Sequence, residues 1–429
     1  MKKSVDIGIG IDCGTSGIRA FALTSDGNVL ASTQTPLIKQ TPMAWWQATM
    51  LVMDELGHEL SLALRAQHAV IGGCALSYDA TSSTVFLTDK QGSPISDVQM
   101  YHQSQPELAQ ALTHRLSPNS GAVGASSSLV KVLALIQGCD VGLDWMVCHQ
   151  ADWIGLKLTG MGAISDENNV LKLGYDVVNR CWPAEVLALI PESSLPRVLP
   201  PATPFAPLLP ELALRWQLPV HTQVATGTTD SIAAFLATKA NRLGDAVISL
   251  GSTLAFKLLC HQPFFNAQQG IYSHRLWDQW LIGGASNAGG AVLLEQFSLD
   301  NLIALSQAIN VERRQNLDYY PLPKQAKGER FPMSNPNQQS KLIPRPAKDA
   351  DFLQAMLEGL VSIEQQGWQN LEALSGQVIH RLFSCGGGTK NPAWAGLRAV
   401  QLPYPTSPPF SQEAAVGSAL LALKSLETH

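Results

Sequence analysis

The chain has 429 residues, 45% of them hydrophobic, and this length exceeds what one hydrophobic core usually supports, so we expect two domains. Its 29 Lys and Arg against 34 Asp and Glu give a net charge of −5, which argues against non-specific nucleic-acid binding. No apolar run is long enough to span a bilayer or to form a signal peptide. Seven scattered cysteines without a Cys-x-x-Cys pair indicate reduced thiols. We therefore expect a cytoplasmic protein without a nucleic-acid or membrane partner.

The first part of the sequence predicts a sheet followed by a long helix. Residues 5–36 have the pattern of a β-meander with a hairpin turn at Asp26-Gly27. Residues 46–65 have helical spacing, with an apolar stripe formed by Leu51, Leu56, Leu60 and Leu64. Strands are expected at 71–76 and 84–87, on either side of a Ser/Thr turn.

The rest of the sequence alternates periodic segments with proline-rich connections. We predict irregular connections over 191–219, which has room for one helix, and over 318–346. The other expected elements are helices at 127–137, 151–158, 230–236, 350–375 and 413–426, and strands at 246–250, 254–259 and 383–385.

Two loops rich in glycine and hydroxyl groups are built on the same plan. Asp12-Cys13-Gly14-Thr15-Ser16-Gly17 and Gly251-Ser252-Thr253 each join an apolar strand to a returning strand. A tight hairpin turn of this kind offers backbone N–H groups and hydroxyls to phosphate oxygens. Two such turns predict a nucleotide held between two related halves, although the P-loop pattern is absent. Asp12 would help to position a metal, or else simply close the turn as an Asx residue.

Asp230 follows Gly227-Thr228-Thr229 at an expected helix start. One interpretation is an N-cap, which is a common use of Asp. The other is a base that receives the proton of an attacking hydroxyl. Phosphoryl transfer tolerates a base of such low pKa because its loose transition state needs mainly orientation.

The triple glycine Gly386-Gly387-Gly388 follows a strand and precedes Lys390-Asn391. Three glycines at this place indicate either the close approach of a flat ligand or a turn with positive φ. Asn391 would reach a base or ribose edge, and Trp394 would lie against the ring or belong to the core.

In this order, these segments resemble the FGGY carbohydrate kinases of the actin-like ATPase superfamily. The resemblance rests on residues 11–16 and 249–253 as the two phosphate motifs, 227–231 as the segment with the catalytic aspartate, and 385–391 as the adenosine motif. It implies an α/β fold of two actin-like, ribonuclease H-like ATPase domains with a cleft between them. The sugar-binding domain would span residues 1–236 and the adenosine-binding domain 237–412, with the closing helix in 413–429 packed back on the first.

The resemblance also implies the ligands and their contacts. The cofactors would be ATP and Mg²⁺, and the partner a small ketose. The catalytic residues would be Asp230 as base and Asp12, and both would also hold the metal. The ketose would contact Asp12, Gly14, Thr15, Ser16, Ser82 and Asp230, and the nucleotide would contact Thr15, Gly251, Ser252, Thr253, Gly387, Gly388 and Asn391.

Within the family, the segment from Tyr78 to Thr84 is similar to the Asp-Gly-Thr-Ser segment of the short ribulokinase-type branch. D-ribulose is therefore the expected substrate, and D-xylulose or another ketose is the alternative. Two departures stand out: Ala80 and Ser83 replace the usual glycines of this turn, and Ala134 replaces an aromatic residue. An actin-like ATPase with a chaperone or sensor role is the rival from another class. The sequence leaves open whether the protein is a monomer or a homodimer.

Overall fold

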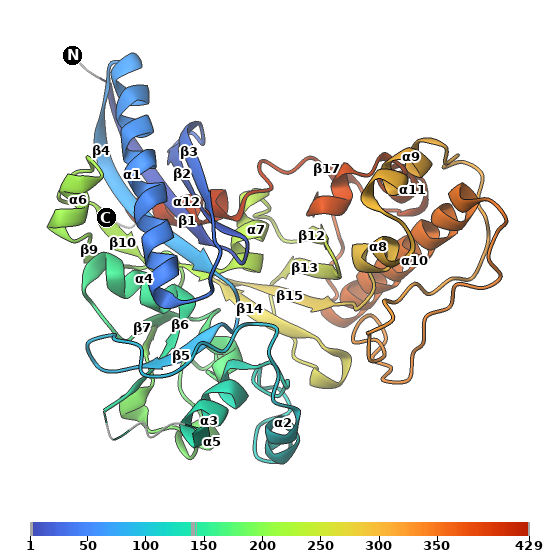
Figure 1. Cartoon of the computed structure of the whole chain (residues 1–429), viewed down its shortest axis with the longest axis horizontal. Helices are drawn as coiled ribbons and strands as arrows, with labels where there is room; N and C mark the ends of the chain where they lie inside the picture. The colour runs from blue at the N-terminus through green and yellow to red at the C-terminus, as the bar shows by residue number, and fades with distance from the viewer. Residues whose placement is uncertain (1–2, 139–141, 143, 428–429) are drawn as a thin grey trace. The chain divides into compact units, whose positions relative to one another are not determined.

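The computed structural model describes residues 3–138, 142 and 144–427, which form two compact units, each with its own β-sheet (Figure 1). Unit 1 contains the chain up to Ala237, Arg275–Trp277 and the chain from Glu413 onward, and unit 2 contains Thr238–His274 and Asp278–Gln412. Among the described residues, no helix has both the length and the apolar character needed to cross a membrane.

The sheet of unit 1 begins as an antiparallel meander and continues with parallel strands. β1, β2 and β3 pair as antiparallel neighbours, β4 lies parallel to β1, and β10 and β11 lie parallel to β4. The predicted meander is therefore confirmed. The elements of unit 1 are β1 (Lys3–Cys13), β2 (Gly17–Thr24), β3 (Val29–Pro36), α1 (Pro42–Ala66), β4 (Ala69–Ala80), β5 (Val85–Thr88), α2 (Pro106–Leu112), α3 (Ser128–Gly138), β6 (Met146–His149), α4 (Gln150–Thr159), β7 (Ile164–Asp166), α5 (Ala184–Leu187), β8 (Arg197–Leu199), β9 (Pro204–Pro207), α6 (Pro210–Arg215), β10 (Gln223–Ala225), β11 (Thr228–Thr229), α7 (Asp230–Ala237) and α12 (Ala414–Leu426).

Helices cover both faces of this sheet because β1 alternates two kinds of residue. Ile9 and Ile11 are buried in the hydrophobic cluster that includes the core residues of α1. Gly8 and Gly10 point to the opposite face, where α12 packs. A Cβ on Gly10 would lie 2.0 Å from the carbonyl oxygen of Ala415, so glycine at this position lets α12 lie directly on the sheet.

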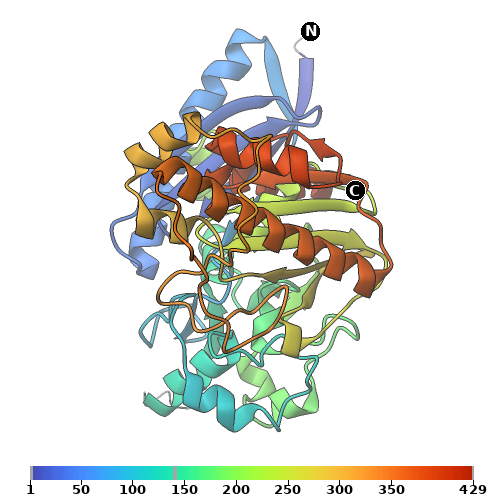
Figure 2. The ribbon, with the colours of Figure 1, turned by 90° about the vertical axis from the view of Figure 1, so that its right-hand side faces the viewer.

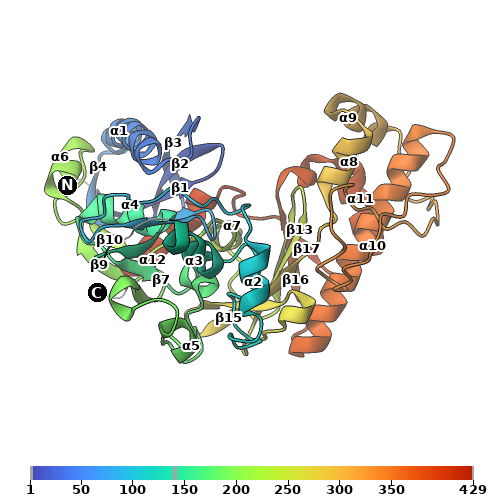
Figure 3. The same cartoon turned by 60° about the horizontal axis from the view of Figure 1, so that its bottom comes forward.

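A second hydrophobic cluster of unit 1 lies away from α1 (Figure 3). It contains buried side chains of β5, β6, α2, α3 and α5. β5 pairs with β6, and α3 packs against β5. This packing places α3 behind the turn that joins β4 to β5.

The sheet of unit 2 repeats the plan of the unit 1 sheet. β12, β13 and β15 are antiparallel neighbours, β16 lies parallel to β12, and β17 lies parallel to β16. β12 therefore corresponds to β1 and β16 to β4. Helices α10 and α11 lie across one face of this sheet (Figure 2). The remaining elements are β12 (Asp245–Leu250), β13 (Leu254–Cys260), β14 (Tyr272–Leu276), β15 (Gln279–Ala285), α8 (Gly290–Gln296), α9 (Leu299–Gln307), α10 (Asp349–Ser375), β16 (Arg381–Cys385), α11 (Pro392–Gln401) and β17 (Thr406–Ser407).

The sequence located the long helices but not all of their details. The helix predicted at 46–65 is α1, which begins earlier, at Pro42, because the Thr41 side chain caps it. The predicted apolar stripe is wrong at Leu51, which is 62% exposed, because five residues turn the helix well away from the face of Leu56. The strands β14 and β15 and the helices α8, α9 and α11 were not predicted.

Candidate active site

Two carboxyl groups meet at the ends of β1 and β4. Asp12 and Asp79 are partners in register on these parallel strands, so both side chains lie on the face that α12 covers. Asp12 is 6% exposed and Asp79 is fully buried. The hydroxyl of Ser418 on α12 donates a hydrogen bond to Asp79 Oδ2 over 2.6 Å. Sequence analysis gave a role only to Asp12, although Asp79 also ends an apolar strand, which was a usable signal.

Arg19 makes the pKa values of the two carboxyl groups different. Burial raises the pKa of both, because a charged carboxylate loses its hydration. At Asp12 this effect is opposed by Arg19, which lies directly opposite on β2 and places Nη1 3.2 Å from Asp12 Oδ2. At Asp79 the negative charges of Asp12 and Asp230 add to the burial, so its pKa lies well above the usual range. Asp12 therefore loses its proton more readily than Asp79 does.

Asp230 joins this pair from the start of α7. Thr228 and Thr229 pair with Asp79 and Ala80 of β4, so the chain enters α7 beside the end of β4. The half-buried Asp230 accepts the N–H of the next residue at Oδ1 over 2.6 Å. The structure thus brings the two aspartates predicted as catalytic to one edge of the unit 1 sheet, with β4 between the strands that carry them.

The first predicted phosphate loop is the turn of the β1–β2 hairpin. Its Gly14 N–H donates to the Gly17 carbonyl over 3.1 Å. Gln40 Nε2 donates to the Thr15 carbonyl over 2.6 Å, and the side chains of Thr15 and Ser16 are exposed. The turn is therefore held from one side and presents hydroxyl groups to solvent, which suits an oxygen-rich ligand.

The second predicted phosphate loop is the matching turn of the β12–β13 hairpin. Its Gly251 N–H donates to the Thr253 carbonyl over 3.2 Å. The first residues of α8 hold this turn, because Gly290 N–H donates to the Gly251 carbonyl over 2.8 Å and Ala291 N–H to the Ser252 carbonyl over 3.1 Å. Ser252 is exposed at the tip.

Unit 2 contains a cavity of about 670 Å³ beside this second turn. This volume is typical of small-molecule sites, and its walls are mainly aliphatic, as a flat base requires. The residues around it are Leu250, Gly251, Ser252, Gly290, Leu293, Leu294, Leu299, Leu302, Ile303, Ser306, Gln307, Gly387, Gly388, Lys390, Asn391, Pro392 and Trp394. The leucines and isoleucine of α8 and α9 were not predicted, because these helices were not recognised.

Gly387 lines the cavity without being packed against the rest of the protein. A Cβ on Gly387 would meet no atom within 4 Å, so packing within the protein does not require glycine there. A Cβ on Gly388 would lie 2.7 Å from Trp394 Cζ3. The positive φ predicted for this turn belongs to Gly386, at 87°, and not to Gly387. Gly387 therefore keeps open a space that a side chain would otherwise fill.

Asn391 has a structural role at the edge of this cavity. Its Oδ1 accepts the Trp394 N–H over 3.0 Å and so caps α11. Its Nδ2 donates to Ser306 Oγ of α9 over 2.9 Å. Asn391 thus ties α9 to α11, and its contact with the base or ribose stays a prediction.

The metal role of Asp12 and Asp230 also stays a prediction. In the part of the chain that the structure describes, no group of three or more His, Cys, Asp or Glu side chains is placed to hold a metal ion. Mg²⁺ is commonly bound by one or two carboxylates together with water and nucleotide phosphates. Two aspartates at one sheet edge, one of them paired with Arg19, fit that mode of binding.

Ser82 lies at the tip of the turn between β4 and β5. The Thr84 N–H donates to the Thr81 carbonyl over 3.3 Å and closes the turn. Ser83 has a φ of 65°, the left-handed conformation that glycine adopts more readily. This turn follows Asp79 by two residues, so Ser82 is on the same edge of unit 1 as the aspartates.

Comparison with known proteins points to sugar kinases. Residues 246–426 match the FGGY family of carbohydrate kinases, C-terminal domain. Over most of its length the chain is also similar to curated sugar kinases. It is 24% identical to a xylulose kinase from Klebsiella pneumoniae over 96% of its own length and 89% of the relative. It is 21% identical to a gluconokinase from Bacillus licheniformis over 97% of its own length and 86% of the relative.

Solved structures of sugar kinases share the fold of this chain. A xyloylose kinase from Brucella ovis has a TM-score of 0.84 at 21% identity, covering 99% of this chain and 91% of its own. A gluconate kinase from Lactobacillus acidophilus has a TM-score of 0.84 at 17% identity, covering 99% and 90%. The predicted fold of two actin-like, ribonuclease H-like ATPase domains is confirmed. The ribulokinase-type branch stays a prediction.

Proposed function

We propose that this chain is an FGGY carbohydrate kinase that transfers the γ-phosphate of ATP to a hydroxyl of a five-carbon ketose, with D-ribulose as the first candidate and D-ribulose 5-phosphate as its product. The observation that carries this proposal is the gathering of Asp12, Asp230 and the hydroxyl-bearing Ser82 turn at one edge of the unit 1 sheet. Acidic and hydroxyl groups of this kind orient a polyol by hydrogen bonds.

In this mechanism Asp230 orients the attacking hydroxyl and accepts its proton. The new bond joins the sugar oxygen to the γ-phosphorus, and the bond from that phosphorus to the bridging oxygen of ADP breaks. An ordinary carboxylate suffices as the base, because the hydroxyl loses its proton late in a loose transition state. Asp12, which Arg19 contacts, binds the ketose and fixes its position. Mg²⁺, when bound to the nucleotide, would offset the negative charge of the phosphates.

Each hairpin turn by itself offers groups that suit a nucleotide. The base and ribose would occupy the cavity of unit 2, against the leucines of α9 and the open backbone of Gly387. The exposed hydroxyls of Ser252 and of Thr15 suit phosphate oxygens. This division assigns the acceptor sugar to unit 1 and the adenosine to unit 2.

D-xylulose is the second candidate, and the relatives named xylulose kinase favour it. The two ketoses differ in the configuration of one hydroxyl, which a polar site distinguishes through paired or unpaired hydrogen bonds. An actin-like ATPase with a chaperone or sensor role remains the candidate from another class.

A substrate panel tests the proposal. Purified protein with ATP and Mg²⁺ would be assayed for ADP release with D-ribulose, D-xylulose, D-gluconate and glycerol, and products identified by mass. We expect kcat/KM for D-ribulose to be the highest of the four. A higher value for D-xylulose would replace the first candidate with the second. ATP hydrolysis unaffected by any sugar would instead favour the actin-like ATPase.

A further inference from the structure

A buried lysine holds the Ser82 turn from behind. Lys131 of α3 is fully buried. Its Nζ donates to the Ser83 carbonyl over 2.9 Å and to the Tyr101 carbonyl over 3.2 Å. Both of these acceptors are neutral, so they repay only part of the cost of removing an ammonium group from water. The two hydrogen bonds therefore do not offset the loss of hydration of the buried lysine. Their effect is to fix the positions of two backbone segments.

The two segments are the Ser82 turn, residues 81–84, and the Tyr101 strap, residues 99–101. The strap lies beside the start of β5, where Gln99 and Val85 exchange backbone hydrogen bonds of 2.8 and 3.0 Å. The Tyr101 N–H also donates to Thr84 Oγ1 over 3.2 Å. Lys131 adds a further contact between the two segments, because its Nζ binds the Ser83 carbonyl of the turn and the Tyr101 carbonyl of the strap.

Ser83 explains why the turn needs this support. A non-glycine residue at a φ of 65° is strained, and glycine would adopt that conformation without a side-chain penalty. The buried Ser83 hydroxyl has no hydrogen-bond partner among the described residues. The Ser83 carbonyl, by contrast, is fixed by Lys131, so the strained peptide is held through its backbone.

The position of α3 is itself anchored by a buried polar network. His149 Nδ1 lies 3.0 Å from Asp152 Oδ2, and His149 Nε2 lies 3.0 Å from Ser128 Oγ, one helical turn before Lys131. The neighbouring Gln150 accepts two hydrogen bonds at Oε1 from Thr81, from its N–H over 3.3 Å and its hydroxyl over 2.7 Å. The turn is thus held from both ends.

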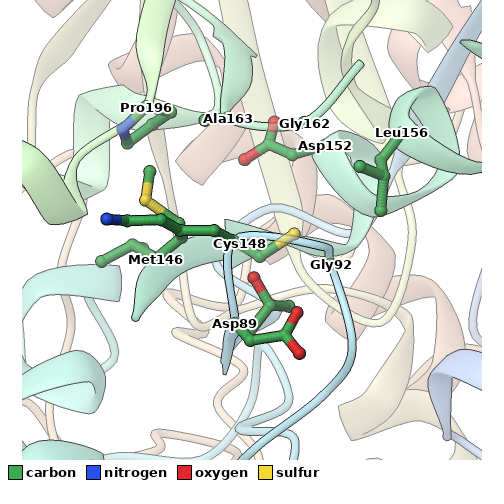
Figure 4. A pocket seen from close by; sticks show the side chains of 12 residues that line it. Asp89, Gly92, Met146, Cys148, Asp152, Leu156, Gly162, Ala163 and Pro196 are labelled. Carbon is green, nitrogen blue, oxygen red and sulfur yellow. The ribbon is translucent and has the colours of Figure 1, made fainter. Parts of the chain in front are cut away.

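Beside this network lies a small cavity, lined by Asp152 and Cys148 among others, with a volume of about 20 Å³ (Figure 4). Such a space holds about one water molecule, so this cavity is too small for a ketose. The contact of the buried groups with the Ser82 turn is therefore the route by which we expect them to affect the ketose.

We propose that Lys131 is a positioning residue for ketose binding, whose amino group fixes the Ser82 turn against the Tyr101 strap and so sets the position of Ser82. The proposal rests on the proposed function, because Ser82 is there the sugar contact. Loss of the Lys131 contacts would release a strained turn, and the sugar would have to restore its conformation on binding. The nucleotide cavity is built from unit 2 residues, so nucleotide binding is expected to be independent of Lys131.

The test is a double-mutant cycle between Lys131→Met and Ser83→Gly. Methionine keeps the length and apolar stem of lysine but donates no hydrogen bond. We expect Lys131→Met to raise KM for the preferred ketose by about tenfold, the effect of losing one to two hydrogen bonds, with KM for ATP unchanged. In the Ser83→Gly background the increase should fall to about threefold or less, because glycine adopts the turn without support.

Three measurements keep the proposal falsifiable. An equal increase of KM in both backgrounds, or a parallel increase for ATP, would show that Lys131 only stabilises the fold. Lys90→Met, at an exposed lysine paired with Asp144, is the matched control and should change neither KM. If Lys131→Met does not fold, Thr84→Val is the substitute, because it removes the side-chain oxygen that accepts the Tyr101 N–H of the strap. This variant should raise KM for the ketose and leave KM for ATP unchanged. An unchanged KM for the ketose would overturn the proposal.

Direct binding separates this inference from the proposed function. Calorimetric titration of the ketose into parent and Lys131→Met protein needs no turnover. Equal affinity in the two proteins refutes the role of Lys131 while the kinase function stands. A parent protein that neither binds nor phosphorylates a ketose refutes the function itself.

Discussion

The two hairpin turns occupy equivalent places in their sheets but carry different side chains. In unit 1, the residues in register before the turn and on the neighbouring parallel strand are Asp12 and Asp79. In unit 2, the corresponding pair is Ser249 and Cys385. In both turns a glycine N–H donates a hydrogen bond to a carbonyl further along the turn, from Gly14 to Gly17 in unit 1 and from Gly251 to Thr253 in unit 2. The shared backbone suits anion binding, whereas acids, and with them acid–base chemistry, occur at this place only in unit 1.

The units also differ in how they bury charge. Unit 2 pairs its buried charges: Arg398 Nε and Nη2 lie 2.7 and 2.9 Å from the carboxylate of Glu364. Unit 1 buries Lys131 against carbonyl oxygens, and it buries Asp79 beside another carboxyl group. Unpaired buried charge costs stability, so it marks the unit in which positioning of side chains matters most.

The largest effect is expected at Asp230, the proposed catalytic base of unit 1. Asp230→Ala should lower kcat by about 10²–10⁴-fold, the usual loss for a positioned acid–base group, with ATP binding largely kept. Steady-state kinetics and calorimetry would measure the two effects. Asp300→Ala, at an exposed acid in the first turn of α9, is the control and should retain normal turnover. Near-normal turnover in folded Asp230→Ala protein would remove its catalytic role.

The next effect concerns the close packing of α12 on β1 in unit 1. Gly10→Ala would place a methyl group 2.0 Å from the Ala415 carbonyl oxygen, so α12 would have to move. We expect a loss of about 1–3 kcal/mol in the free energy of unfolding, as for other overpacked cores. At the equivalent position of β12, unit 2 keeps a side chain, Val247. Thermal unfolding of the two variants measures this loss. Gly124→Ala is the control, because a Cβ there meets no atom within 4 Å. Equal melting temperatures of Gly10→Ala and Gly124→Ala would contradict the close packing of α12 on β1.

A smaller effect is expected at the glycine turn of unit 2. Gly387→Val should weaken ADP binding by about tenfold, because its side chain would enter the cavity, a loss of about 1.4 kcal/mol. The melting temperature should stay unchanged, since a Cβ there meets no protein atom and φ is not positive. Calorimetry with ADP and with ketose is the measurement. Lost ketose binding with intact ADP binding would reverse the assignment of ligands to units.

The smallest effect is a pH dependence that belongs to unit 1. Burial, with a contribution from Lys172, lowers the pKa of Lys131 to about 7, from an ordinary value of about 10.4. Between these pH values the unfolded chain binds a proton that the folded chain lacks, so this group adds stability as the pH rises from 7 to 10. Denaturant unfolding should therefore show the parent gaining stability relative to Lys131→Met over this range. Parallel pH curves for the two proteins would contradict the lowered pKa.

The sequence by itself determined the strand–turn–strand plan and the two-domain fold. Alternating isoleucine and glycine in β1, the hydroxyl-rich turns and the triple glycine are local patterns, and each depends on residues that are neighbours in the chain. The family resemblance followed from their order. Local patterns also placed Asp12 and Asp230 among the candidates, because they stand at the end of a strand and at the start of a helix, whereas Ser82 was added by the family resemblance.

Only the tertiary structure decided which side chains act together. Asp79 became part of the site because β4 lies in register beside β1, and Lys131 because α3 packs behind a turn some 50 residues earlier in the chain. The aliphatic cavity walls depend on how the short helices α8 and α9 pack beside the turn of the β12–β13 hairpin. Pairing in register, burial and the charge state of a carboxyl group arise from contacts between distant segments, and no local pattern in the sequence encodes them.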